Sequence, residues 1–142
     1  MKNLLLVFIS IALFSTCNST KTSNSKNNGN QDNTELNGEY LVTNLYGEDV
    51  SEMKITMKFD TENKNVLGYS GCNTYSSPYT IEEGTITFGT PNASKRMCLD
   101  DTYIEKKFFK ALSELKNISQ KQSSLTFGNN NNDQVLIAKK GL

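Results

Sequence analysis

The sequence has no histidine among its 142 residues. Histidine is the commonest metal ligand and the commonest general base near neutral pH, so its absence weighs against metal chemistry and acid–base catalysis. The chain also has no excess of charge, with 15 basic and 15 acidic residues. It contains no basic tract with interleaved aromatic residues, so nucleic-acid binding is not expected. No block of like charges indicates electrostatic attachment to a membrane.

Long apolar runs are missing as well. The apolar stretch that begins at Leu4 has about 11 residues, whereas a membrane-spanning helix needs about 20. With Lys2 before it, this stretch is typical of a secretory signal peptide. The sequence Phe-Ser-Thr-Cys that ends at Cys17 then resembles a lipobox, where bacterial lipoproteins are cleaved before a lipidated cysteine. We therefore expect a signal peptide at 1–16 and a lipid anchor on Cys17. The alternative is an ordinary secreted protein in which Cys17 is incidental.

The segment that follows has no apolar side chain to bury. Residues 18–35 are polar or glycine throughout, so they cannot offset the entropy of ordering the backbone. With Cys17 they are expected to form a disordered tether, 17–35, with a reach on the order of 25 Å. A recognition arm is the alternative. The rest of the chain is long enough for one domain with one core, which we place at 36–139, with a short tail at 140–142.

The chain has three cysteines. If Cys17 carries lipid, Cys72 and Cys98 remain as a pair in an oxidising compartment, where disulfides form. A bond between them would close a loop of about 27 residues and contribute roughly 3 kcal/mol to stability. The alternative is two small buried apolar side chains that never meet. A catalytic thiol is not expected, because there is no histidine to activate it and no Cys-x-x-Cys motif.

Alternating apolar and polar residues predict a mainly β structure. The clearest alternation is at 53–59, which is typical of a strand with one buried face. A first strand is predicted at 39–45. Three hairpins are predicted across turns rich in Asn, Gly and charged residues: 53–59 with 66–69, 79–81 with 85–88, and 124–127 with 135–138.

One helix is predicted between these strands, at about 102–116. Thr102 and Glu105 have the spacing of a capping box, in which the threonine accepts a backbone hydrogen bond and the glutamate reaches back to the helix start. Apolar residues recur at helical spacing and form one stripe, which we expect to cover the open face of the sheet: Ile104, Phe108, Leu112 and Leu115.

Three features in this order resemble the META domain, also called the HslJ-like domain. They are the triplet Gly71-Cys72-Asn73, the pair Met97-Cys98, and the helix that contains Glu105. The resemblance covers about residues 36–139. It implies a mainly β (α+β) fold, a compact antiparallel sheet or partial barrel with one packing α-helix. The family consists mostly of small bacterial envelope lipoproteins, some of them heat-inducible, and it has no agreed molecular function.

Asn73 is the most suggestive polar residue of this set. Its side chain could hold the turn by binding neighbouring backbone, or it could contact a ligand. The nearby Tyr69, Tyr75 and Tyr79 could form an aromatic surface or pack in the core and at its edge. The sequence predicts no catalytic residue, no metal site and no cofactor.

These observations favour a non-enzymatic lipoprotein of the bacterial cell envelope. We expect a monomer that is lipid-anchored to the outer membrane and faces the periplasm. It would support envelope or heat-stress tolerance by binding a protein or an envelope component. One alternative is a small-ligand carrier, or an inhibitor of an envelope hydrolase, that uses a loop or the barrel mouth. The other is an enzyme that uses Cys72, Asn73 or a carboxylate.

Overall fold

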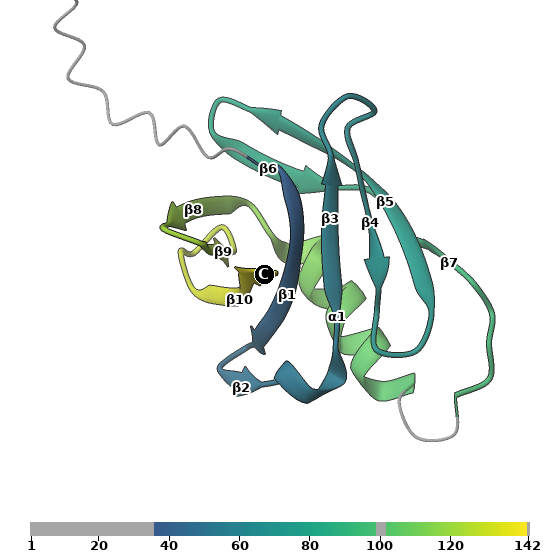
Figure 1. The fold of residues 1–142 in the computed structure, drawn as a ribbon. Coiled ribbons are helices and arrows are strands. Elements are labelled where there is room, and N and C mark those ends of the chain that lie inside the picture. Colours follow the sequence, from purple (N-terminus) through teal and green to yellow (C-terminus); the bar gives the residue numbers. More distant parts are fainter. Residues whose placement is uncertain (1–35, 99–101, 142) are drawn as a thin grey trace, which may run out of the picture. The chain divides into compact units, whose positions relative to one another are not determined.

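Ten strands, one α-helix and one short 3₁₀-helix make up residues 36–98 and 102–141, the part of the chain that the computed structural model describes (Figure 1). The elements in chain order are β1 (Gly38–Leu45), β2 (Glu48–Asp49), η1 (Ser51–Met53), β3 (Thr56–Asp60), β4 (Asn65–Tyr69), β5 (Thr74–Glu82), β6 (Thr85–Phe88), β7 (Asn92–Ala93), α1 (Thr102–Glu114), β8 (Asn117–Lys121), β9 (Ser124–Gly128) and β10 (Gln134–Lys140).

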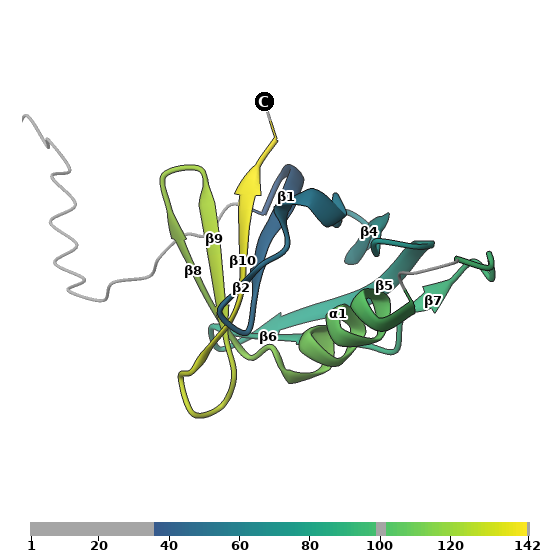
Figure 2. The same cartoon turned by 90° about the horizontal axis from the view of Figure 1, so that it is seen from below.

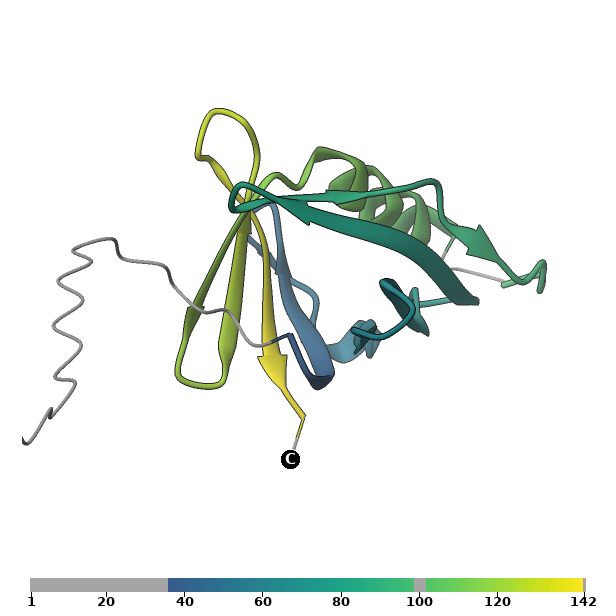
Figure 3. The same ribbon diagram turned by 90° about the horizontal axis from the view of Figure 1, so that it is seen from above.

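The long strands form an antiparallel sheet that closes on itself. Their order in space is β10-β9-β8-β6-β5-β4-β3-β1, and β1 also pairs with β10. The join between β6 and β8 is a single residue pair, Thr85 with Asn117, so the closure is weak there. Figures 2 and 3 show the wall of β8, β9, β10 and β1 meeting β5 and β6 at an angle. The predicted partial barrel with one helix is therefore confirmed.

The three predicted hairpins are also present. Lys58 pairs with Leu67 in the first, Tyr79 pairs with Phe88 in the second, and β9 pairs with β10 in the third. The first strand of the first hairpin begins at Thr56 rather than at Met53. Residues 51–53 form a 3₁₀ turn, and Lys54 has a left-handed φ of 54°, which ends the extended conformation there.

Strand β5 is longer than predicted and begins at Thr74. Its first half contains serine and Pro78, which are poor indicators of a strand. Proline is accommodated because β5 changes partner at this point: Ser76 pairs with β4 and β7, and Tyr79 pairs with β6. Strands β2, β7 and β8 were not predicted either. At the other end, β10 includes Lys140, which the sequence had assigned to the tail.

Aromatic side chains fill the interior between the walls. A series of rings crosses it from β1 to β9, with centroids 5.5 to 6.3 Å apart: Tyr40, Phe59, Tyr79, Phe88 and Phe127. Three of these contacts are edge-to-face, the arrangement that the ring quadrupole favours. Burial of these large side chains is the main source of the domain's stability.

The helix α1 covers the sheet with the stripe that the sequence predicted. Phe108 and Leu112 are fully buried, and Ile104 is nearly so. The helix ends at Glu114 rather than at about 116, and Leu115, which follows it directly, is also fully buried. The Phe108 ring meets Tyr75 of β5 edge-on, with centroids 5.2 Å apart. Figures 2 and 3 show α1 running alongside β5 and β6. The helix therefore completes the core on this side.

Predictions for residues 1–35 lie outside the described residues. They are the signal peptide, the lipidation of Cys17 and the tether. Within 36–98 and 102–141, no helix combines the length and the apolar character of a membrane span.

Candidate functional site

The Gly71-Cys72-Asn73 turn joins β4 to β5 and faces the first turn of α1. Gly71 has a φ of 96°, a left-handed conformation that favours glycine. A Cβ atom at this position would lie 2.8 Å from Cγ2 of Ile104. Glycine is therefore required both for the backbone conformation and for the close approach of the helix.

The side chain of Asn73 is buried and connects three segments. Its Oδ1 accepts hydrogen bonds from the backbone N–H of Arg96 at 2.8 Å and from the hydroxyl of Ser94 at 2.9 Å. Its Nδ2 donates to Glu105 of α1 at 3.2 Å. The sequence suggested bonds to neighbouring backbone, but these partners lie 21 to 32 residues away. One amide therefore links the turn, the segment after β7 and the helix.

Ser70 and Glu105 complete this arrangement. The backbone N–H of Ser70 donates to the carbonyl of Asn73 at 2.8 Å, and the N–H of Asn73 donates to Ser70 Oγ at 3.1 Å. Because an amide already satisfies that carbonyl, the Ser70 hydroxyl can donate to the Glu105 carboxylate, with which it is in close contact. We call Ser70, Asn73, Ser94, Glu105 and the backbone of Arg96 the polar knot.

The position of Glu105 differs from the predicted capping box. Its two carboxylate oxygens accept hydrogen bonds from the side chains of Ser70 and Asn73. The capping box predicted a bond to the backbone at the helix start instead. A carboxylate near a helix N-terminus is still favoured by the helix dipole. The side chain of Thr102, the other member of the box, lies outside the described residues. The glutamate therefore serves a tertiary contact between the helix and the turn.

Cys72 and Cys98 form a disulfide, which confirms the predicted pairing. Their Cα atoms lie 5.9 Å apart, a usual separation for such a bond. The bond joins the turn to the segment after β7, which Asn73 also holds through Arg96. A covalent link and a polar link thus connect the same two segments. Met97 belongs to the same predicted motif but is 99% exposed, so it takes no part in the core.

A groove of about 730 Å³ lies on the outer face of the sheet beside the polar knot. Outward-facing side chains of β4 and β5, with residues in and after β7, form most of its surface: Leu67, Tyr69, Thr74, Ser76, Asn92 and Ser94. These strands lie in a row in Figure 1. The strand register places Leu67 beside Ser76 and Tyr69 beside Thr74. Ser94 belongs to both the groove and the polar knot. We call this surface the outer groove.

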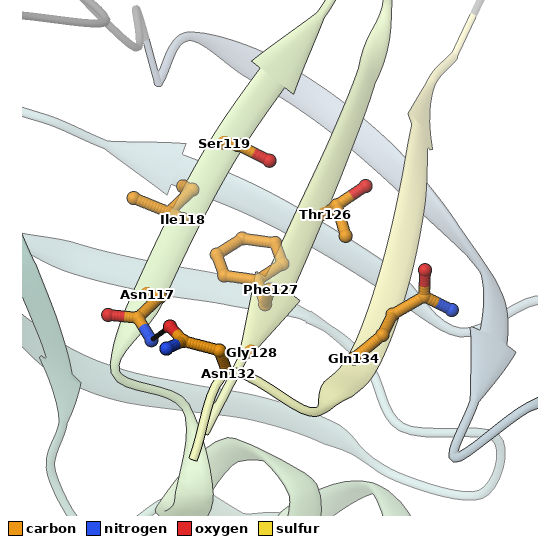
Figure 4. Close-up of a pocket in the computed structure, with 8 residues that line it drawn as sticks. All are labelled: Asn117, Ile118, Ser119, Thr126, Phe127, Gly128, Asn132 and Gln134. Carbon is orange, nitrogen blue, oxygen red and sulfur yellow. Dashed lines mark hydrogen bonds between the residues drawn. The ribbon is translucent and has the colours of Figure 1, made fainter. Parts of the chain in front are cut away.

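Two other hollows are weaker candidates. The one in Figure 4 holds about 170 Å³ between β8, β9 and the following loop, and Asn117 and Asn132 point toward one another across its end. Their side chains are already joined by a 2.8 Å hydrogen bond. The other, of about 590 Å³, lies on the polar face of the β5–β6 hairpin, at the end of β5 away from the turn. Neither adjoins the Gly-Cys-Asn turn.

Two tyrosines of the core, Tyr75 and Tyr79, remain protonated at physiological pH. Burial raises the pKa of Tyr75, whose hydroxyl donates to the carbonyl of Thr56 at 3.0 Å. Burial, and then the charge of Asp60, also raise the pKa of Tyr79. Both tyrosines are buried core residues, whereas Tyr69 is 36% exposed. Of the groups that line the groove, only Glu39 has a formal charge. Among the described residues, no cluster of three or more potential metal-binding side chains occurs.

The structure brings five of the residues singled out from the sequence to one junction: Gly71, Cys72, Asn73, Cys98 and Glu105. Sequence reasoning missed Ser70 and Ser94. Ser70 directly precedes the motif, which is a weak signal, and Ser94 follows a strand too short to recognise. Tyr69 was named, but its place on an outer surface depends on the register of β4 against β5.

Comparisons with known proteins agree with this architecture. The META domain family matches residues 32–141. The fold is similar to an NMR structure of a protein from Burkholderia xenovorans, with a TM-score of 0.59 and 20% identity over 75% of this chain and 83% of that chain. It is also similar to a crystal structure of a DUF4847 family protein from Bacteroides vulgatus, with a TM-score of 0.58 and 12% identity over 75% and 94%. At these identities the similarities show the fold alone. None of the curated proteins matches the chain.

Proposed function

Because this chain belongs to the META domain family, we propose that it is a non-catalytic binding protein of the bacterial cell envelope, anchored through a lipid on Cys17. The domain binds a protein or another envelope component and thereby supports envelope or heat-stress tolerance. The observation that carries this proposal is the Cys72–Cys98 disulfide within the domain. Structural disulfides persist in oxidising compartments and are rare in the cytosol. An exported location is also what the apolar stretch beginning at Leu4 favours.

The state of the motif residues supports a non-catalytic role. Ser70 is fully buried and Asn73 is 4% exposed, so neither presents a reactive group to a substrate. Cys72 and Cys98 are joined to each other, so neither offers a free thiol. A buried polar network whose members satisfy one another stabilises a unique packing arrangement. The motif is therefore best explained as the structure that holds the helix to the sheet, and the outer surface remains for binding.

The interior of the barrel does not favour a carrier that encloses its ligand. Tyr40 and Tyr79 are buried across it, with Phe59 between them at ring distances of 6.0 and 5.5 Å. A ligand in that space would have to displace well-packed rings, which is costly. Binding is therefore expected on the outer surface, where the outer groove lies.

Metabolic labelling tests the anchor. Bacteria that produce the full chain are grown with a fatty-acid analogue, and the chain is purified from membranes. We expect label in the wild type and none in Cys17→Ser, while Cys98→Ser keeps the label. Label that persists in Cys17→Ser, or a wild type that takes up none, would contradict the lipidated form.

Crosslinking in intact cells tests the binding role. The full chain is compared with a control in which residues 1–35 precede an unrelated globular domain. We expect a discrete crosslinked envelope component that requires residues 36–139 and is absent from the control. Identical products from both chains would show that the tether alone determines the contacts.

A further inference from the structure

We propose that the outer groove binds an uncharged oligosaccharide, which lies across β4, β5 and β7. This proposal rests on the proposed function to the extent that an envelope location would provide glycans as binding partners. The groove volume, about 730 Å³, falls within the range of about 300–1,000 Å³ that is typical of ligand sites. It is an open surface depression, which suits an extended chain of rings.

The apolar part of the outer groove suits the flat face of a sugar ring. Tyr69 is 36% exposed and Leu67 is 39% exposed, and both point outward from β4. The hydroxyl of Tyr69 donates to the carbonyl of Gly71 at 2.8 Å, so the Gly-Cys-Asn turn fixes the orientation of the ring. Pyranose rings have a face of C–H groups that packs against aromatic rings. A ring that is already held loses little side-chain entropy when a ligand binds.

The polar part of the groove suits the hydroxyl rim of a sugar. Thr74, Ser76 and Asn92 supply two hydroxyls and one amide, which can both donate and accept hydrogen bonds. The hydroxyl of Ser94 donates to Asn73 at 2.9 Å and accepts from the hydroxyl of Thr74 at 3.4 Å, so its oxygen has one lone pair left for a ligand. Apolar and polar side chains lie side by side across the two strands, because Leu67 pairs with Ser76 and Tyr69 pairs with Thr74. Sugars have this same mixture of apolar faces and polar rims.

The charge and the backbone of the groove argue for a neutral sugar and against other ligands. Glu39 is its only formally charged lining residue, so nothing in the lining would neutralise a polyanion. An extended peptide that added a strand would need free backbone groups at a sheet edge. Here β5 is paired on both sides, with β4 and with β7, at Tyr75 and Ser76. The edge strand of this surface is β7, which has only 2 residues and offers little backbone for an added strand. Recognition by side chains is therefore the mode that this surface offers.

The test is direct binding by the full chain, purified in a detergent without a sugar head group. The probes are the neutral hexasaccharides cellohexaose, maltohexaose and hexa-N-acetylchitohexaose, and binding is measured by titration calorimetry and saturation-transfer NMR. We expect at least one to bind with a dissociation constant below about 1 mM. Tyr69→Ala should weaken binding at least about tenfold, as loss of an aromatic anchor does. Asn92→Ala should weaken it about threefold or more.

Matched variants separate binding from folding. Tyr103→Ala removes a tyrosine that is 71% exposed on α1 and does not line the groove, so affinity should change less than about twofold. Tyr69→Phe keeps the ring but loses the hydroxyl that holds it, so its affinity should lie between those of the wild type and Tyr69→Ala. Leu67→Lys replaces an apolar side chain with a longer one that ends in a charged ammonium group, and it should weaken binding about fivefold or more. Thermal melts identify any variant that is unfolded.

Two results would overturn the proposal. One is that none of the three hexasaccharides binds the folded wild type. The other is that folded Asn92→Ala and Leu67→Lys bind as tightly as the wild type, which would place the sugar elsewhere. This test uses purified protein, so its failure leaves the labelling and crosslinking results for the envelope role intact. Failure of Cys17 labelling, conversely, leaves sugar binding measurable.

Discussion

The barrel interior and the polar knot hold the same domain together by different means. In the interior, Tyr40 and Phe59 meet edge-to-face at 6.0 Å, and stabilisation comes mainly from removing apolar surface from water. In the knot, each polar side-chain atom of Asn73 has a specific partner on another segment. The interior should therefore tolerate a change of shape that keeps its volume. The knot should not tolerate loss of a partner, because a buried polar group would remain unsatisfied.

The largest effect is expected where the interior is emptied. Phe108→Ala removes a fully buried ring that meets Tyr75 at 5.2 Å, and it should lower the free energy of unfolding by about 3–5 kcal/mol. Phe108→Leu should cost much less, since it keeps more of the volume. Urea denaturation measures both. Tyr103→Ala, on the exposed side of the same helix, is the control, with a change within about 0.5 kcal/mol. Equal costs for Phe108→Ala and Tyr103→Ala would refute a core role for the stripe.

The next effect comes from the covalent link beside the knot. Reduction of Cys72–Cys98, which are 26 residues apart, should cost about 3–4 kcal/mol through loop-closure entropy. In a domain of this size, each kcal/mol lowers the melting midpoint by about 4–8 °C. Thermal melts with and without reductant, with mass spectrometry of free thiols, measure the change. A variant with alanine at both positions should have a lowered melting midpoint that does not change when reductant is added. A fully reduced wild type with an unchanged melt would show that the bond adds nothing.

Breaking the knot itself should cost somewhat less. Asn73→Ala leaves the Arg96 N–H, the Ser94 hydroxyl and the Glu105 carboxylate without this partner, so we expect a loss of about 2–3 kcal/mol. Ser113→Ala, at an exposed position of α1, should be nearly neutral. Urea denaturation measures both losses, through the unfolding midpoints of Asn73→Ala and Ser113→Ala. If Asn73→Ala were also neutral, directional bonding at the turn would be dispensable.

The pH dependence of a second variant sharpens this result. Asn73→Asp keeps the acceptor oxygens but places a carboxylate where Nδ2 now lies 3.2 Å from Glu105. The nearby negative charge raises the pKa of the introduced carboxyl in the folded state. A raised folded pKa favours folding at low pH and costs stability as the pH rises, so the variant should be least stable near pH 7 and recover toward about pH 4. Glu105→Gln in the same chain should restore part of the loss at pH 7. A pH-independent loss would contradict the assigned contact.

The smallest effect is expected at an exposed polar contact. Burial, and then the hydrogen bond to Glu114 at 2.7 Å, raise the pKa of Tyr46 to about 12. Because the pKa of Tyr46 is raised in the folded state, the contact adds stability at any pH below the ordinary tyrosine pKa. This added stability is lost as the pH rises through about 12. Glu114→Gln should lower the pKa of Tyr46 and change stability at pH 7 by less than about 1 kcal/mol. Ultraviolet titration, with Tyr46→Phe to identify the signal, measures the pKa. If Glu114→Gln lost as much stability as Asn73→Ala, the expected difference between exposed and buried polar contacts would be wrong.

Local pattern in the sequence was enough to predict most elements. The alternation before Phe59 indicated a strand with one buried face, and the spacing of Ile104 and Phe108 indicated the helix stripe. Failures occurred where an element depends on its partners. Strand β8 contributes only Ile118 to the core side, and its backbone is held by pairing with β9. Pairing energy of this kind is not visible in a short polar segment.

The sequence by itself determined the periodicities, the position of Gly71 and the pair of cysteines, because each depends on a few neighbouring residues or on a count. Only the tertiary structure decided that Glu105 binds Ser70 and Asn73, 35 and 32 residues away. It also decided which outward-facing side chains of β4, β5 and β7 share one groove. Secondary-structure preferences act over a few residues. The choice of a distant hydrogen-bond partner follows from closure of the sheet and docking of the helix, which depend on the whole core.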